Sequence, residues 1–194
     1  MSDYKEVMSN DPRKKIVIVG DEKCGKTSLI YKYFSGALPD PAVPIMYREY
    51  QTDVEVGDQK IPIVLWIVPA EERIRKHRPL INKFSKAVIL CYAIDDPTSL
   101  RNACEKWYPE IERYIPKVPI VLVGNKIDLR SDENVINELA SKSLEPVSFE
   151  QGKEAAEKIK AEKYIECSAK NNDAVKEVFK AAAVESLLIS YLLK

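Results

Sequence analysis

The chain lacks a net charge, because 30 lysine and arginine residues are balanced by 30 aspartate and glutamate residues. Proteins that attract nucleic acid or an anionic membrane through their overall field normally carry an excess of positive charge. The balance therefore predicts no nucleic-acid partner. Long apolar runs are also missing, since the longest stretches, such as residues 87–94, are too short to cross a bilayer.

Metal-ligand and secretory signals are absent as well. The single histidine, His77, has no acid or nucleophile placed with it, and the four cysteines show no metal-ligand spacing. This pattern indicates reduced intracellular thiols. Residues 1–13 are polar, contain neither a signal peptide nor a Met-Gly acylation site, and are predicted to be a flexible lead. Residues 14–194 are long enough to form one domain with a full core.

A strand, a glycine-containing loop and a helix follow one another near the start of the domain. Residues 15–19 form a β-branched run typical of a buried strand, and residues 20–27 fit the pattern G-x-x-x-x-G-K-[ST]. Loop amides and the positive end of the next helix favour a phosphate ligand, with Lys26 on the phosphates and the Thr27 hydroxyl on Mg²⁺. The predicted phosphate-binding residues are Glu22, Lys23, Cys24, Gly25, Lys26, Thr27 and Ser28.

Cys24 lies inside this loop and has two interpretations. The first is a small apolar filler. The alternative is a redox-sensing thiol whose pKa is lowered by the loop amides.

Two further motifs indicate a guanine base. Asn125-Lys126-Ile127-Asp128 follows an apolar strand, and the Asp128 carboxylate can accept both hydrogens of the guanine N1 and N2 edge, which adenine does not offer. Lys126 can cover the base plane with its aliphatic stem. Ser168-Ala169-Lys170 follows another strand and can donate a backbone amide to the guanine O6. The predicted guanine-binding residues are Asn125, Lys126, Asp128, Ser168, Ala169 and Lys170.

The apolar pattern predicts an α/β fold with a six-stranded, mostly parallel sheet and helices on both faces. Gly57-Asp58 is a hairpin signal, so one edge pair is expected to be antiparallel. Strands are predicted near residues 15–20, 50–56, 61–67, 86–93, 119–124 and 163–166. Helices are predicted near residues 26–34, 98–114, 150–161 and 173–190.

With these motifs the chain resembles the Ras superfamily of small GTPases, and within it the Rho branch. Residues 20–27 are similar to that branch's G-D-x-x-C-G-K-T loop, residues 166–170 to its E-C-S-A-K, and residues 105–110 to its E-K-W-x-P-E. A charged segment near residues 130–148 resembles the Rho-type insert helix. The resemblance covers residues 14–185. It implies a P-loop NTPase fold, GDP or GTP with Mg²⁺ as ligands, effector and exchange-factor partners, and cytoskeletal signalling.

The second switch segment departs from that family. Where relatives read W-D-T-A-G-Q, this chain reads Trp66-Ile67-Val68-Pro69-Ala70-Glu71. Ile67 replaces the aspartate that holds a Mg²⁺ water, Ala70 the glycine that contacts the γ-phosphate, and Glu71 the glutamine that orients the attacking water. Phosphoryl transfer depends on such positioning, and a carboxylate is repelled by the γ-phosphate. Slow or absent hydrolysis is predicted, and no residue is assigned as catalytic.

Other departures affect affinity. Ile45 stands where a threonine closes over Mg²⁺, and Leu38 stands where an aromatic ring stacks on the base, a contact worth about 1 kcal/mol. Glu22 adds a carboxylate near the γ-phosphate unless Lys23, Arg73 or Arg75 pairs with it. Binding is expected to survive, weaker and faster exchanging, with GDP favoured over GTP and Mg²⁺ held weakly.

Three functional interpretations remain open from the sequence. The first is a Rho-like signalling switch or adaptor that binds guanine nucleotide and hydrolyses it slowly. The second is a pseudoGTPase interaction module that needs no nucleotide and binds effector or scaffold proteins. The third is a working GTPase in which Glu71 replaces the missing glutamine.

The C-terminus predicts no membrane anchor. Rho relatives end in a basic stretch and a prenylated C-a-a-X box, whereas this sequence ends Tyr191-Leu192-Leu193-Lys194. The end is either natural, with its apolar residues as a docking surface, or cut before a tail. A cytoplasmic protein is expected, peripheral to a membrane only if a lipidated tail is missing.

Overall fold

The computed structural model describes residues 13–40, 49–171 and 173–192. Its centre is a six-stranded sheet in the order β2-β3-β1-β4-β5-β6, in which only the β2–β3 pair is antiparallel. The strands are β1 (Lys14–Gly20), β2 (Glu49–Val56), β3 (Gln59–Ile67), β4 (Ala87–Ala93), β5 (Ile120–Asn125) and β6 (Lys163–Glu166). All six predicted strands and the antiparallel edge hairpin are confirmed. The predicted lead over residues 1–13 lies, apart from its last residue, outside the described residues.

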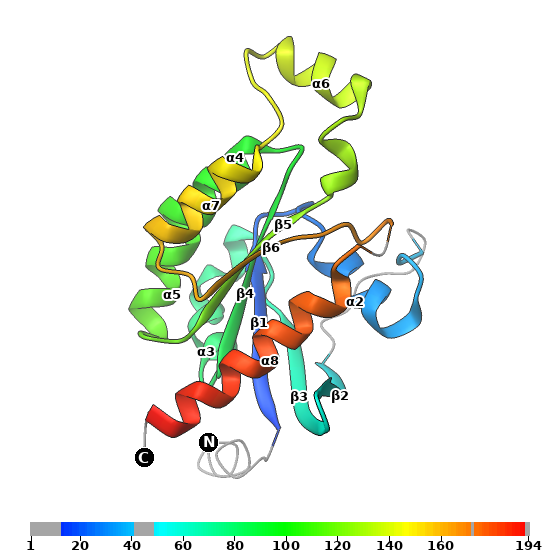
Figure 1. Cartoon of the computed structure of the whole chain (residues 1–194). Coiled ribbons are helices and arrows are strands. Elements are labelled where there is room, and N and C mark those ends of the chain that lie inside the picture. Colours follow the sequence, from blue (N-terminus) through cyan, green and yellow to red (C-terminus); the bar gives the residue numbers. More distant parts are fainter. Residues whose placement is uncertain (1–12, 41–48, 172, 193–194) are drawn as a thin grey trace.

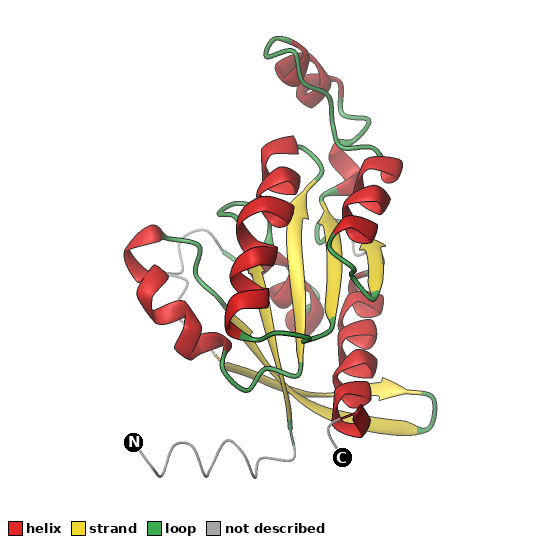
Figure 2. Cartoon of the chain, turned by 90° about the vertical axis from the view of Figure 1, so that its left-hand side faces the viewer, coloured by secondary structure: helices red, strands yellow, loops and turns green. Residues whose placement is uncertain are grey.

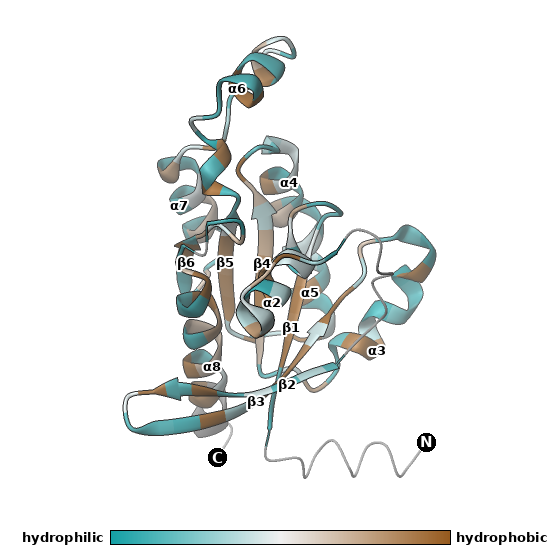
Figure 3. Cartoon of the chain, turned by 90° about the vertical axis from the view of Figure 1, so that its right-hand side faces the viewer, coloured by the Kyte–Doolittle hydropathy of each residue, from teal (hydrophilic) through white to brown (hydrophobic). Residues whose placement is uncertain are grey.

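Helices cover both faces of this sheet (Figures 1, 2 and 3). They are α2 (Lys26–Ser35), η1 (Glu72–His77), α3 (Arg78–Asn82), α4 (Pro97–Asn102), η2 (Ala103–Trp107), α5 (Tyr108–Tyr114), η3 (Ile127–Leu129), α6 (Glu133–Ala140), α7 (Phe149–Lys158) and α8 (Val175–Leu192). In the described part of the chain, none of these helices combines the length and apolar character needed to cross a membrane.

Alternate residues of the buried strands face two separate cores. Ile16 and Ile18 of β1 pack with α2 and α8, where Phe179 is fully buried. Val17 and Val19 point to the opposite face and pack with η2, α5 and α7, around the buried ring of Trp107. This two-residue period is the one expected for strands covered on both sides.

The predicted helix over residues 98–114 differs in detail. It forms α4 and α5 joined by η2, one wide π-helical turn just before Pro109. A proline nitrogen has no hydrogen to donate to the preceding turn, so the helix changes pitch there. Residues 72–82 form the short helices η1 and α3, which the sequence did not predict. Within the predicted insert, α6 is capped by the Asp132 side chain and projects beyond the body of the domain (Figure 1).

Parallel strands bring their following loops to one edge. In the sheet register Gly20 lies beside Cys91, Ala93 beside Asn125, and Gly124 beside Glu166. The loops after β1, β4, β5 and β6 therefore meet at the carboxyl ends of the strands, where ligands of open α/β sheets bind. All three sequence motifs leave the sheet at this edge.

Candidate functional site

The loop between β1 and α2 needs glycine at two positions. Gly20 has φ +145° and Gly25 has φ +92°. A Cβ at Gly20 would lie 2.1 Å from the Cys91 carbonyl oxygen, and one at Gly25 would lie 2.1 Å from Asn125 Nδ2. Larger residues would separate the loop from the strands beneath it. The structure thus supplies a physical reason for the first glycine and the last glycine of the predicted phosphate motif.

Lys26 is folded back over this loop. Its Nζ donates to the carbonyl oxygens of Gly20 at 2.8 Å and Asp21 at 2.5 Å, and the residue is only 8% exposed. The ammonium group is thereby held above the loop at the start of α2. Both this charge and the helix dipole favour an anion in the same place.

Side chains that are distant in the sequence hold the phosphate loop against β5, α4 and η2. Asp21 accepts hydrogen bonds from Asn102 Nδ2 at 2.6 Å and Trp107 Nε1 at 2.8 Å, while Asn125 Nδ2 donates to the Cys24 carbonyl at 3.1 Å. Neither Asp21 nor Asn102 was predicted to belong to the site. The sequence signal for this contact was the E-K-W-Y-P-E motif, because its Trp107 donates to Asp21 in the phosphate loop.

Cys24 packs beneath the loop with Cys91 and Ala93 and is almost fully buried. The Cys91 sulfur lies 3.5 Å from the Cys24 carbonyl oxygen. A hydrogen bond from Cys91 to the Cys24 sulfur, with Lys26 nearby, lowers the pKa of Cys24 to about 7 although burial opposes this. The packing of Cys24 agrees with the apolar-filler interpretation, whereas the lowered pKa of its thiol is what the redox-sensing alternative requires.

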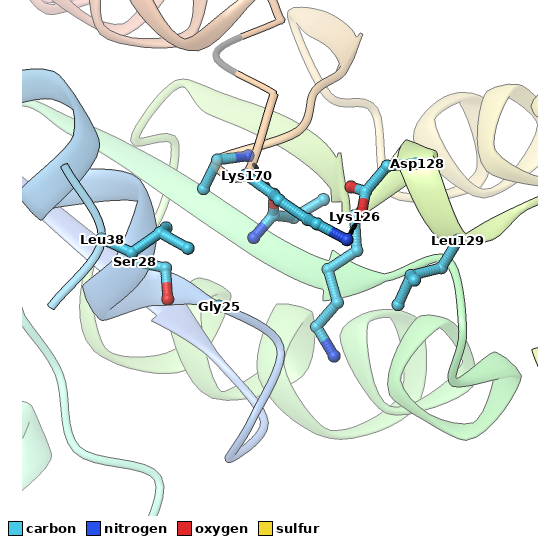
Figure 4. Close-up of a pocket in the computed structure, with 9 residues that line it drawn as sticks. Gly25, Ser28, Leu38, Lys126, Asp128, Leu129 and Lys170 are labelled. Carbon is cyan, nitrogen blue, oxygen red and sulfur yellow. Dashed lines mark hydrogen bonds and ion pairs between the residues drawn. The ribbon is translucent and has the colours of Figure 1, made fainter. Parts of the chain in front are cut away.

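Five of the six predicted guanine residues, all except the buried Ser168, line one pocket of about 210 Å³. Ser168 instead supports Asp128 from behind the lining: its Oγ donates to Asp128 Oδ1 at 2.5 Å, and Lys170 Nζ lies 4.0 Å from Asp128 Oδ2. The Ala169 amide donates to Asn125 Oδ1 at 3.3 Å. Figure 4 shows Leu38 and Ser28 from α2 and its following loop across the pocket from Lys126 and Asp128. Residues 40 positions apart are thus brought together as the sequence predicted.

Lys126 adopts a left-handed conformation with φ +65° between β5 and η3. Its Nζ pairs with Asp95 Oδ2 at 3.0 Å, at the end of β4. The other oxygen, Asp95 Oδ1, is buried without a hydrogen-bond partner among the described residues. Asp95 was not recognised from the sequence, because an aspartate after a buried strand carries no sign of its lysine partner.

The phosphate side of the site is more open. Glu22 and Lys23 are exposed, and Thr27 and Ser28 are half-buried at the start of α2. Neither candidate arginine pairs with Glu22. Arg73 lies 3.8 Å from Glu71 and Arg75 lies 3.1 Å from Glu72, in both cases between side-chain N and O atoms.

The residues of the second switch segment that depart from the family pattern make contacts within the domain. Ile67 packs against the core on the α8 side, and the Ala70 carbonyl accepts a hydrogen bond from Arg78 Nη1 at 3.2 Å. Glu71 immediately precedes η1, and its carboxylate lies 3.8 Å from Arg73. Ile45 lies outside the described residues, so the prediction about it stays a prediction.

A guanine nucleotide fits the residues present. Lys26 supplies a cation at the phosphate loop, and Asp128 presents carboxylate oxygens inside a pocket with apolar walls. Mg²⁺ is less well provided for. Thr27 offers a hydroxyl, whereas Ile67 offers no oxygen at the position where relatives hold a metal-bound water.

A phosphate loop on the first strand, with guanine-type loops after β5 and β6, defines a P-loop GTP-binding protein. The family model described as "Ras family" matches residues 15–188. The chain is 44% identical over 181 residues to the "GTP-binding protein rho5" of Schizosaccharomyces pombe, covering 93% of this chain and 90% of that protein. The chain belongs to the Ras family of small GTPases, and within it to the Rho branch.

Proposed function

We propose that this protein is a Rho-like signalling switch or adaptor that binds guanine nucleotide and hydrolyses GTP slowly or not at all. Ras-family GTPases generally bind guanine nucleotide with Mg²⁺, and Rho GTPases act through effectors and regulators. The observation that carries the proposal is a contrast within one site. The base-recognition residues are assembled around Asp128, while the positions that would activate water are engaged elsewhere.

Two positions support the loss of hydrolysis. Ile67 is apolar and packed on the core, and Glu71 carries a carboxylate, 3.8 Å from Arg73, where relatives carry an amide. Catalysis of phosphoryl transfer relies on placing water and neutralising charge at the γ-phosphate. A carboxylate at the water-orienting position adds repulsion instead. The state of such a switch would follow from nucleotide exchange or protein abundance.

A single-turnover assay tests this function. Protein preloaded with GTP at saturating Mg²⁺ is expected to hydrolyse it below about 10⁻⁴ s⁻¹, slower than the roughly 3–5 × 10⁻⁴ s⁻¹ intrinsic rate of Ras. The double variant Ile67→Asp/Glu71→Gln restores a carboxylate for the metal and an amide for the water, and should be at least about tenfold faster.

Two controls make the assay decisive. The exposed substitution Glu138→Gln should leave the rate unchanged, and Lys26→Ala should remove bound GTP and so reveal contaminating phosphatase. Wild-type turnover at or above the intrinsic Ras rate that disappears in Glu71→Ala would sink the proposal. That result would establish Glu71 as a working replacement for glutamine.

A second candidate is an interaction module that needs no nucleotide. The observation in its favour is that the two charged side chains of the pocket have protein partners: Lys126 pairs with Asp95, and Asp128 is paired by Ser168 and Lys170. The loops can therefore keep their shape unliganded. The Rho resemblance adds several further parts to the first proposal, the signalling switch. These are effector or scaffold partners, exchange factors, a role in cytoskeletal signalling and a cytoplasmic location.

A further inference from the structure

A partly buried polar cluster joins the two segments that carry the guanine-recognition loops. It consists of Arg130, Glu166, Tyr164 and Tyr92, and is called the clasp below. Arg130 Nη1 donates to Glu166 Oε2 at 2.8 Å and its Nη2 donates to Oε1, which makes a bidentate pair. Tyr164 Oη donates to Glu166 Oε1 at 2.6 Å and lies 2.8 Å from Tyr92 Oη. None of the four residues lines the pocket itself.

The clasp is tightly packed. A Cβ at Gly152 of α7 would lie 1.9 Å from Tyr164 Oη and 2.5 Å from Tyr92 Oη, so the helix rests directly on both hydroxyls. Burial raises the pKa of each tyrosine, and the hydrogen bonds to Glu166 raise the pKa of Arg130. Arg130 therefore stays charged and the tyrosines stay neutral. Arg130 Nε also donates to the Val147 carbonyl at 3.0 Å, which fixes the plane of the guanidinium group.

The two ends of the clasp stand at the roots of the two guanine-recognition loops. Arg130 directly follows η3, which carries Asp128, and its amide donates to the Ile127 carbonyl at 3.1 Å. Glu166 ends β6, two residues before Ser168. A bidentate arginine–carboxylate pair defines both distance and orientation between its partners. It therefore holds the Asp128 loop against the loop of residues 168–170, together with the Ile127 amide, which donates to the Cys167 carbonyl at 3.1 Å, and the Ser168–Asp128 hydrogen bond.

We propose that Arg130 and Glu166 are positioning residues that hold these two loops at the separation a guanine base requires. Asp128 must meet the N1 and N2 edge while the amide of residue 169 or its neighbours meets O6, and hydrogen bonds weaken steeply when distance or angle is wrong. The inference rests on the guanine-nucleotide binding proposed above. It adds two residues outside the pocket that determine specificity for the base.

The test compares release of GDP and IDP, since IDP lacks the exocyclic N2 amino group. In Glu166→Gln, which keeps the side-chain shape but removes the charge, fluorescent GDP should leave about two- to thirtyfold faster. The advantage of GDP over IDP should shrink at the same time. General destabilisation would speed both nucleotides equally, so the ratio is the readout that a merely structural role does not change.

Matched variants sharpen the comparison. Arg130→Lys keeps the charge without the bidentate fork and should be intermediate. The double variant Arg130→Met/Glu166→Gln should release GDP no faster than the faster of the two single variants, Arg130→Met and Glu166→Gln, because both changes break the same interaction. Glu138→Gln removes an exposed carboxylate that pairs with Lys142 and should change neither rate.

The outcomes separate this inference from the proposed function. A wild-type protein that binds GDP, together with variants of unchanged release rate and unchanged ratio, overturns the positioning role alone. A wild-type protein that binds neither nucleotide overturns both. Should Glu166→Gln fail to fold, Tyr164→Phe decides the matter, because it removes one hydrogen bond to Glu166 and keeps the ring; it is expected to shift the ratio in the same direction by less.

Discussion

Replacing Asp128 by asparagine is expected to lower the affinity for GDP and create affinity for XDP. The carboxylate accepts two hydrogen bonds from guanine, and bonds to a charged group contribute about 1.5–3 kcal/mol each, so losing them should weaken GDP binding by roughly a hundredfold or more. Xanthine carries an oxygen in place of the N2 amine and can accept a hydrogen bond from the new amide. Competition of GDP and XDP against a fluorescent nucleotide measures both changes.

This substitution is well matched to the site. Asparagine keeps the oxygen that accepts from Ser168 Oγ and removes only the long ion pair with the exposed Lys170, at 4.0 Å, which contributes little to stability. Asp132→Asn is the control, because Asp132 lies nearby but caps α6 through the amides of Asn134 and Val135, a task that asparagine also performs. Equal GDP affinity in Asp128→Asn and wild type would show that the pocket does not read the base.

Replacing Arg78 by methionine is expected to destabilise the fold by about 3–5 kcal/mol, the usual effect of breaking a buried ion pair from one side. The Arg78 side chain is 0% exposed and Glu110 is 12% exposed. Arg78 donates to both Glu110 oxygens, at 2.8 and 2.9 Å, and lies over the Trp107 ring with its Cζ 4.9 Å from the ring centroid. Urea denaturation followed by circular dichroism gives the free energy of unfolding.

The size of this effect should depend on burial and not on the loss of an arginine. Arg75→Met removes a pair with Glu72 in which both side chains are more than 60% exposed, and should change stability by less than about 1 kcal/mol. The double variant Arg78→Met/Glu110→Leu should lose less than the sum of the two single changes. Additive losses would contradict a direct pairing.

The phosphate loop and the guanine motifs could be predicted because each depends on local sequence. Apolar runs identify β1 and β5, and the residues after a buried parallel strand must lie at the carboxyl edge of the sheet. Six strands and four helical regions were placed within a few residues for the same reason. In α8 the buried residues Val175, Val178 and Phe179 follow one another at helical spacing, in agreement with the helix predicted over residues 173–190.

Ion pairs between residues far apart in the sequence could not be predicted from it. Arg78 and Glu110 are 32 residues apart, Arg130 and Glu166 are 36 apart, and Lys126 and Asp95 are 31 apart. An arginine or glutamate in sequence looks the same whether it faces solvent or a buried partner. The short helices η1 and α3 were missed because residues 72–82 carry no apolar period, and their position follows from the contact of Arg78 with Ala70, Trp107 and Glu110.

The most direct test of the account is the nucleotide that the protein already holds. Freshly purified protein is denatured, and the released nucleotide is identified and quantified by ion-exchange chromatography. Stoichiometric guanine nucleotide is the expected result, and recovered GTP would further support the loss of hydrolysis. An empty protein that also shows no thermal shift on addition of GDP or GTP with Mg²⁺ would contradict it and leave the nucleotide-independent interaction module.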